Sequence, residues 1–153
     1  MNTVADRMSK TVVSVSENDP VETVAKVFLE SGHHLLPVLD AEGKVTGVIT
    51  EHDLIDAHRQ VHLPTVISIL DSVIPVAGLQ EYREELRKVT AVDAKGLASR
   101  RHLILARPED TLEDAADRMF EHHVHALPVV DEEGHLLGIL SRSDILRGLL
   151  ARQ

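Results

Sequence analysis

Hydrophobic and polar positions along the first third of the chain predict a strand, a helix, a hairpin and a second helix, in that order. A β-branched run at 11–15 predicts the short strand. Apolar residues recur every three to four positions over 21–28, which is the spacing of one buried helix face. The apolar runs 35–39 and 44–50 are joined by a polar turn and predict a hairpin. A last helix is expected after Thr50.

The same order of elements returns 91 positions further on. The segment 34–40, His-Leu-Leu-Pro-Val-Leu-Asp, recurs at 125–131 as His-Ala-Leu-Pro-Val-Val-Asp. The same shift carries Gly43 onto Gly134 without a gap, so the chain contains an internal duplication. The second copy predicts a strand at 103–105, inward helix positions 112, 115, 116 and 119 (21, 24, 25 and 28 in the first copy), a hairpin, and a last helix after Ser141.

Turn and cap residues mark the ends of these elements. Asp19 and Asp110 are expected to cap the first helix of each copy, because each has a Glu three residues later, as in a capping box. Pro20 suits a first helical position. Gly43 and Gly134 are expected to take the strained position of each hairpin turn.

The segment between the copies is too long to be a structureless loop in a compact protein. Residues 80–89 resemble a short charged helix with Tyr82, Leu86 and Val89 facing inward. An extra helix packed on the core is the ordinary interpretation, and a lid or a partner-docking surface is the alternative. The expected division of the chain is repeat one at 1–58, a helical segment at 59–91 and repeat two at 92–153.

Composition narrows the classes of function. The chain has 153 residues, enough for one compact body, and its net charge of -9 would repel a nucleic-acid backbone. It contains no cysteine, which excludes disulfides, thiolate metal sites and cysteine nucleophiles. The sequence shows no apolar signal core and no run of about 20 apolar residues, so we expect a cytoplasmic protein without membrane insertion.

The repeated pattern closely resembles a known domain family. Each copy reads x-x-Leu-Pro-Val-hydrophobic-Asp, a Gly turn, then Gly-hydrophobic-hydrophobic-Thr/Ser-x-x-Asp-hydrophobic, as in the cystathionine-β-synthase (CBS) domain. Two copies in tandem resemble a Bateman module. Residues 4–8 are similar to the family's lead-in, whereas 92–101 do not preserve it cleanly. The resemblance implies an α+β fold of two β-α-β-β-α CBS repeats packed as a pseudo-two-fold pair.

The resemblance also implies a function. Such pairs have two clefts that bind adenosine-containing ligands, commonly associate as homodimers, and regulate an attached or associated enzyme or transporter. The chain is therefore expected to be a non-catalytic regulatory module with AMP, ADP, ATP or S-adenosylmethionine as its regulatory ligand and no cofactor.

Two aspartates stand at the centre of the expected site. Asp53 and Asp144 match the family's ribose-binding aspartate, and a carboxylate can accept hydrogen bonds from both ribose hydroxyls. Each also lies three residues after a hydroxyl residue, Thr50 or Ser141, which is the spacing of a capping box. The two roles are compatible, because a helix N-terminus also attracts phosphate.

By the same resemblance, each cleft combines the last helix of one copy with the first strand and pre-proline residues of the other. The small Ala126 leaves room for an adenine where the equivalent Leu35 crowds it, so the two clefts are expected to differ. One cleft would use Val48, Thr50, His52, Asp53, His34, His102, Ile104, Val124, His125 and Ala126. The other would use Ile139, Ser141, Ser143, Asp144, His125, Thr11, Val13, His33, His34 and Leu35, with Arg142 as a further cationic candidate.

Histidine is frequent, with ten in the chain, and raises the question of a metal site. Adjacent side chains in a strand point to opposite faces, so His33 and His34 are not expected to share an ion, and no metal is predicted. His34 and His125 could contact a phosphate when protonated, which would make binding sensitive to pH near about 6.5.

Two other classes of function remain as alternatives. One is a structural or oligomerisation module with empty clefts, which docks a partner protein through 63–89. The other is an enzyme such as a His/Asp hydrolase, which is disfavoured because the sequence has no Gly-x-Ser-x-Gly elbow, phosphate-cradling loop or His-Glu-x-x-His helix. No activated nucleophile accompanies His125 and Asp144.

Overall fold

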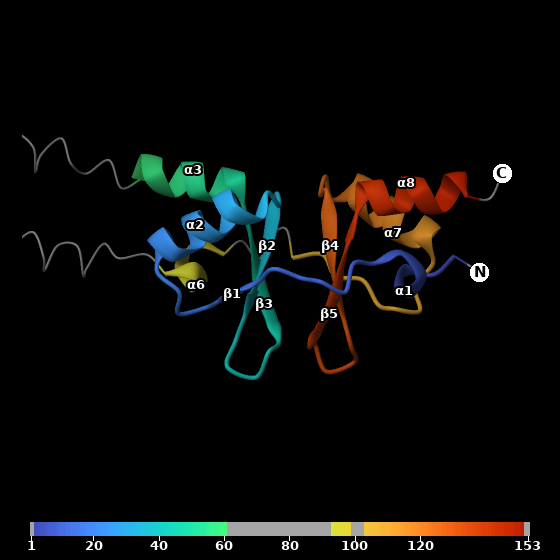
Figure 1. The fold of residues 1–153 in the computed structure, drawn as a ribbon, viewed down its shortest axis with the longest axis horizontal. Helices are drawn as coiled ribbons and strands as arrows, with labels where there is room; N and C mark the ends of the chain where they lie inside the picture. The colour runs from blue at the N-terminus through green and yellow to red at the C-terminus, as the bar shows by residue number, and fades with distance from the viewer. Residues whose placement is uncertain (1, 61–92, 99–102, 152–153) are drawn as a thin grey trace, which may run out of the picture.

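The molecule consists of two halves of similar architecture that stand side by side, with one hairpin in each (Figure 1). The computed structural model describes residues 2–60, 93–98 and 103–151. The first half has a three-stranded sheet in the order β1-β2-β3. Its elements are β1 (Val15–Ser16), α2 (Val21–Ser31), β2 (Leu35–Leu39), β3 (Val45–Thr50) and α3 (Glu51–Gln60).

The second half repeats this order with a two-stranded sheet. The strands of each hairpin are antiparallel, with Leu36 opposite Ile49 and Leu127 opposite Leu140. Both predicted hairpins and the helices after them are confirmed, as is the α+β class. The elements of this half are α7 (Leu112–Glu121), β4 (Ala126–Val130), β5 (Leu136–Ser141) and α8 (Arg142–Leu150).

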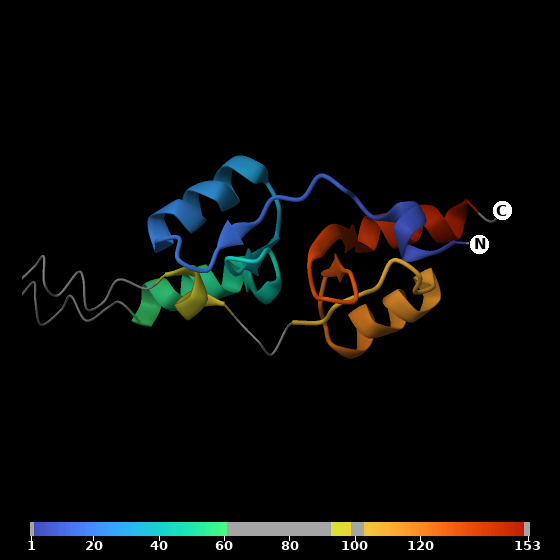
Figure 2. The ribbon, with the colours of Figure 1, turned by 90° about the horizontal axis from the view of Figure 1, so that it is seen from below.

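The first strand of each repeat is shorter than the sequence predicts. A strand was expected at 11–15. In the described structure Val15 and Ser16 pair with β2, and the pairing is parallel. In the second half, 103–105 form no strand, and a bridge between Ala106 and Val129 takes the place of that pairing. The chain before Val15 crosses from the second half to the first (Figures 1 and 2), and on the way Ser9 forms a single bridge with Ile139 of β5.

The predicted caps of the first helices are also wrong. Pro20 is the N-cap of α2, one position before the helix, and Thr111 caps α7, accepting a hydrogen bond from the Asp114 backbone N–H at 3.1 Å. Asp19 and Asp110 instead fold the turn before each helix. Each carboxylate accepts a hydrogen bond at 2.9 Å from the backbone N–H three residues earlier. An aspartate that closes this turn is not available to cap the helix.

The hairpin turns have the conformation that the sequence predicts. Gly43 and Gly134 have φ angles of 81° and 93°, in the left-handed region that favours glycine. Asp131 opens the second turn and accepts hydrogen bonds from the backbone N–H groups of Glu133 at 2.9 Å and His135 at 2.8 Å. The hydrogen bond from the His135 backbone is the main reason that the pKa of Asp131 lies below its ordinary value.

The two hairpin turns also join the halves to each other. The Val45 N–H donates to the Gly134 carbonyl at 3.0 Å, and the Leu136 N–H donates to the Gly43 carbonyl at 3.4 Å. The turns lie at the end of the molecule opposite α3 and α8 (Figure 1). The halves are therefore tied together at one end of the hairpins, which leaves the other end free to form a site.

Each half has its own apolar core, and each core is completed by a segment that precedes the other repeat. Helix α1 (Val4–Arg7) belongs to the core of the second half through the fully buried Val4. Helix α6 (Ala94–Leu97) belongs to the core of the first half. The Val4 N–H donates to the Asp110 carbonyl at 2.9 Å, and the Ala94 N–H donates to the Asp19 carbonyl at 2.8 Å.

Helix α6 also shows how the chain enters the second repeat. The sequence of 92–101 does not preserve the family's lead-in pattern, yet 94–97 form a short helix with the same backbone contacts as α1. Asp93 caps this helix by accepting a hydrogen bond from the Gly96 N–H at 2.9 Å. The lead-in is therefore kept as backbone geometry rather than as sequence.

The helix predicted at 80–89 lies outside the described residues, and so does most of the segment 59–91. Across the described parts of the chain, no helix has both the length and the apolar character that crossing a membrane requires.

Candidate functional site

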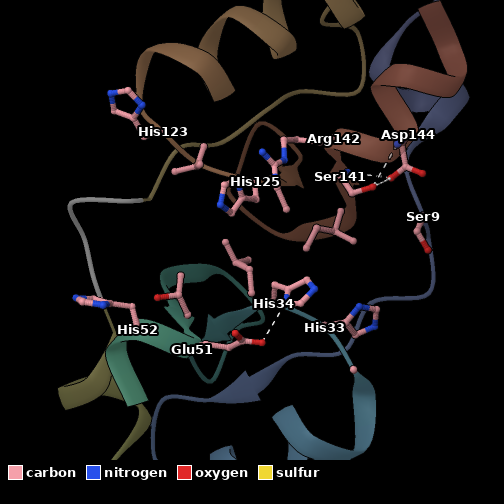
Figure 3. Close-up of a pocket in the computed structure, with 16 residues that line it drawn as sticks. Ser9, His33, His34, Glu51, His52, His123, His125, Ser141, Arg142 and Asp144 are labelled. Carbon is pink, nitrogen blue, oxygen red and sulfur yellow. Dashed lines mark hydrogen bonds and ion pairs between the residues drawn. The ribbon is translucent and has the colours of Figure 1, made fainter. Parts of the chain in front are cut away.

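A cleft of about 780 Å³ opens between the two halves, at the end of the hairpins away from their turns (Figure 3). It lies where β2 and β4 begin and where β3 and β5 pass into α3 and α8. Its volume is within the usual range of about 300–1,000 Å³ for small-molecule sites. The lining residues are Ser9, Gly32, His33, His34, Leu35, Thr50, Glu51, His52, His123, Val124, His125, Ala126, Ile139, Ser141, Arg142 and Asp144.

Most of the residues predicted for ligand binding line this cleft. Residues that were expected in two separate clefts line this single opening. Both repeats contribute equivalent strand ends to it. The predicted residues that line it are His33, His34, Leu35, Thr50, His52, Val124, His125, Ala126, Ile139, Ser141, Arg142 and Asp144.

The other predicted residues do not line the cleft. Val48 is fully buried in β3, Ser143 is exposed on α8, and Ile104 packs against the core of the second half. Thr11 is exposed and Val13 packs against the core of the first half, because the strand expected at 11–15 is replaced by the crossing segment. Asp53 is half-buried at the start of α3, and His102 lies outside the described residues.

Four lining residues were missed: Ser9, Gly32, Glu51 and His123. Ser9 lies beside β5 because its backbone exchanges hydrogen bonds with Ile139, at 2.9 and 3.0 Å. Nothing in the sequence pattern indicates this pairing. Gly32 and His123 are related by the 91-residue shift, and both have positive φ, 66° and 54°. That shift also relates Glu51 to the predicted Arg142, and this relation could have identified Glu51.

The two Thr/Ser-x-x-Asp motifs form the capping boxes that their spacing predicts. Thr50 donates to the Asp53 carboxylate from its backbone N–H at 2.8 Å and from its hydroxyl at 3.0 Å. Ser141 makes the same two bonds to Asp144, at 2.9 and 2.7 Å. In each motif the Oδ2 oxygen of the aspartate accepts both hydrogen bonds at the helix start. The Oδ1 oxygen can therefore accept hydrogen bonds from other groups. The Asp144 Oδ1 lies 3.4 Å from the guanidinium of the exposed Arg147.

Ionisable side chains line both sides of the cleft. The imidazole Nδ1 of His34 lies 2.9 Å from the Glu51 carboxylate, forming an ion pair when His34 is protonated. Arg142 stands beside His125, since its backbone N–H donates to the His125 carbonyl at 3.2 Å. Figure 3 shows these two pairs facing each other from opposite halves. Among the described residues, no group of three His, Asp or Glu side chains is arranged to hold a metal ion.

Comparison with known proteins assigns both repeats. The family model described as "CBS domain" matches residues 4–59 and 94–151. The uncharacterized protein MJ1426 of Methanocaldococcus jannaschii is 29% identical over 96% of this chain and 90% of its own length. The 5'-AMP-activated protein kinase subunit gamma-3 of Bos taurus is 32% identical over 89% of this chain, which spans only 24% of that protein.

A solved structure gives the same result for the fold. The crystal structure of CBSX2 in complex with AMP, a protein from Arabidopsis thaliana, has a TM-score of 0.75 and 25% sequence identity. The match covers 99% of this chain and 98% of that one. The chain therefore belongs to the CBS-domain family and is a tandem pair of CBS repeats, as the repeated motif predicts.

Proposed function

We propose that the chain is a non-catalytic regulatory module that binds an adenosine-containing ligand in the cleft between its two repeats. The observation that carries this proposal is the cleft itself, which both repeats line and which has Asp144 in its wall. The similar CBSX2 structure contains AMP, and another similar protein is a subunit of a 5'-AMP-activated protein kinase. AMP, ADP, ATP and S-adenosylmethionine are the candidate ligands.

The cleft offers suitable surroundings for each part of such a ligand. Leu35, Val124 and Ile139 provide apolar walls for an adenine, and the small Ala126 leaves space beside the backbone. The Asp144 Oδ1 accepts one long hydrogen bond from Arg147, at 3.4 Å, and can accept another from a ribose hydroxyl. The histidines and Arg142 at the opening can donate to phosphate oxygens. The pH sensitivity expected from His34 and His125 stays a prediction.

The hydroxyl groups that line the cleft have structural partners within their own halves. Ser141 and Thr50 donate their protons to the aspartates of their own capping boxes, at 2.7 and 3.0 Å. Ser9 donates to the carbonyl of Thr11 at 3.2 Å. These hydroxyls therefore stabilise the starts of α3 and α8 and the chain before β1.

Calorimetric titration with AMP, ADP, ATP and S-adenosylmethionine tests the proposal. Asp144→Ala should weaken binding about tenfold or more, since a hydrogen-bonded charged group contributes about 1.5–3 kcal/mol. Asp53→Ala is the matched control, because it breaks the same cap in a position that does not line the cleft. It should cost similar stability and much less affinity. Absence of heat with all four ligands would contradict the proposal.

We also propose that the module forms a homodimer through exposed apolar side chains on the helices of its two halves. Leu29 and Phe120 are related by the 91-residue shift and are 86% and 80% exposed, and Ile55 and Leu146 are related in the same way and are 62% and 59% exposed. Each half therefore presents a similar apolar surface to a second copy of the chain. Sedimentation should show a dimer that Phe120→Asp or Leu146→Asp dissociates. A monomeric parent chain would contradict this.

The second candidate function is a module that docks a partner protein while its cleft stays empty. The docking segment expected at 63–89 lies outside the described residues, and the exposed apolar side chains on the helices offer a further surface for a partner. The regulated partner would be an enzyme or a transporter in either case. The ligand titration separates the two functions, because a docking module gives no heat with any nucleotide and still assembles.

A further inference from the structure

The two sides of the cleft carry opposite charges at equivalent positions. Glu51 is the first residue of α3, and Arg142 is the first residue of α8. The 91-residue shift that relates the repeats relates these two residues, and both line the same cleft. The duplication has kept the backbone around them, including the capping boxes, and has reversed the charge.

The two charges differ in whether a neighbour compensates them. The Glu51 carboxylate is 2.9 Å from the imidazole of His34, its neighbour in the same half. Arg142 is next to His125, the equivalent of His34, and makes no ion pair with any acidic side chain that the structure describes. Figure 3 shows Arg142 and His125 on one side of the cleft and the His34–Glu51 pair on the other.

The remaining ionisable groups do not cancel this difference. The charged or titratable side chains that line the cleft are His33, His34, Glu51, His52, His123, His125, Arg142 and Asp144. Asp144 lies on the same side as Arg142, but its carboxylate accepts two hydrogen bonds from Ser141 and is 3.4 Å from Arg147. Arg142 is therefore the permanent positive charge of the cleft that has no described acidic partner.

We infer that the cleft binds its ligand in one orientation, with an anionic group held by Arg142 and His125 on the side of the second repeat. This inference rests on the proposed function and narrows its ligand class. A guanidinium recognises phosphate through paired, charge-assisted hydrogen bonds, so nucleoside phosphates are selected. S-adenosylmethionine carries a cationic sulfonium where a nucleotide carries its first phosphate, and its carboxylate lies at the far end of the methionine chain. It is therefore bound more weakly.

Calorimetry on the full chain with adenosine, AMP, ATP and S-adenosylmethionine tests the inference. Arg142→Gln should weaken AMP and ATP about tenfold or more and change adenosine affinity less than about twofold. Lys26→Gln is the matched control: it changes the net charge equally, but Lys26 is exposed on α2 and pairs with Glu30 at 3.9 Å. It should leave all affinities unchanged.

The outcomes separate this inference from the proposed function. If none of the four compounds binds the parent chain, the proposed function fails. If AMP binds but Arg142→Gln weakens adenosine and AMP equally, or weakens neither, the inference is wrong. Tighter binding of S-adenosylmethionine than of AMP would also overturn it. Where adenosine binds too weakly to titrate, the ratio of AMP affinities between the Arg142→Gln and Lys26→Gln variants decides the question.

Discussion

The turn that leads into the first helix shows how the two repeats differ. Asp19 and Asp110 fold this turn in the same way, each through one hydrogen bond from the backbone. In the second repeat Asp110 also binds the Arg118 guanidinium at 2.6 Å, and Thr111 caps the helix. The first repeat has Pro20 at the cap and no side-chain cap bond. The backbone path is common to both, and the polar groups that support it have diverged.

The cleft shows the same principle at a functional position. Leu35 and Ala126 occupy equivalent places in its wall, and so do Glu51 and Arg142. A two-fold arrangement of backbone thus encloses a site whose two sides differ in shape and in charge. Duplication supplies the scaffold, and substitutions on one side make the site directional.

The largest expected effect comes from the equivalent core residues Leu36 and Leu127. Both are fully buried, one in each core. Truncation of either to alanine should lower the free energy of unfolding by about 2–5 kcal/mol. Because the cores exchange their lead-in helices, urea unfolding followed by circular dichroism should show one shared transition. Two separate transitions would show that the halves unfold independently.

Gly138 tests the contact between the crossing segment and the second half. A Cβ added at Gly138 would lie 2.7 Å from the backbone oxygen of Ser9 and 2.9 Å from the Met8 sulfur. Gly138→Ala should therefore cost about 1–3 kcal/mol, since the segment must move away from β5. Hydrogen exchange should become faster at the Ser9 and Ile139 amides, whereas amides of the β2–β3 hairpin serve as an internal control. Unchanged exchange would contradict the contact.

Substitutions of the turn residues Asp19 and Asp110 should change the free energy of unfolding by an intermediate amount. An asparagine can still accept the backbone hydrogen bond, so Asp19→Asn should be nearly neutral. Asp110→Asn should cost about 1 kcal/mol more, because it also weakens the half-buried bond to Arg118. Chemical denaturation of both variants, and of Asp110→Asn combined with Arg118→Gln, measures the difference. Equal costs at the two positions would show that Arg118 contributes nothing.

The smallest effect concerns acid stability. Hydrogen bonds from the His135 backbone lower the pKa of Asp131 in the folded state. A lowered folded pKa stabilises the protein above the ordinary aspartate value of about 3.9, and this stabilisation is lost as the pH falls through the folded value. Asp131→Asn should therefore flatten the decline of stability between about pH 5 and pH 3 in urea unfolding. An unchanged decline would assign the acid sensitivity to other groups.

The sequence could predict those parts of the fold that short motifs encode. The hairpins follow from alternating apolar residues and from Gly43 and Gly134, and the capping boxes follow from Thr50 and Ser141. Asp19 was assigned to a cap because aspartate favours helix starts and tight turns alike, and local sequence does not decide between them. The exchange of α1 and α6 depends on contacts between distant segments, which no local pattern records.

The candidate site was predictable where it follows the repeat. Ala126, Ser141 and Asp144 line the cleft because strand ends and helix starts keep the same place in both halves. Ser9 was missed because it reaches the cleft through backbone pairing with Ile139, to which its side chain gives no clue. Residues expected in two clefts line the same opening because of how the halves approach each other, which is a tertiary property.

The exchange of the lead-in helices makes the two parts of the polypeptide complementary fragments. A chain cut between α3 and α6 would separate Val4 from the core that it fills and Ala94 from the other core. Neither fragment alone would hold all the residues of a finished core, but the two together would. Reassembly of the fragments would also rebuild the cleft, so a ligand that binds there would favour their association. The two fragments would thus form a split protein, and their association could be measured to detect the ligand.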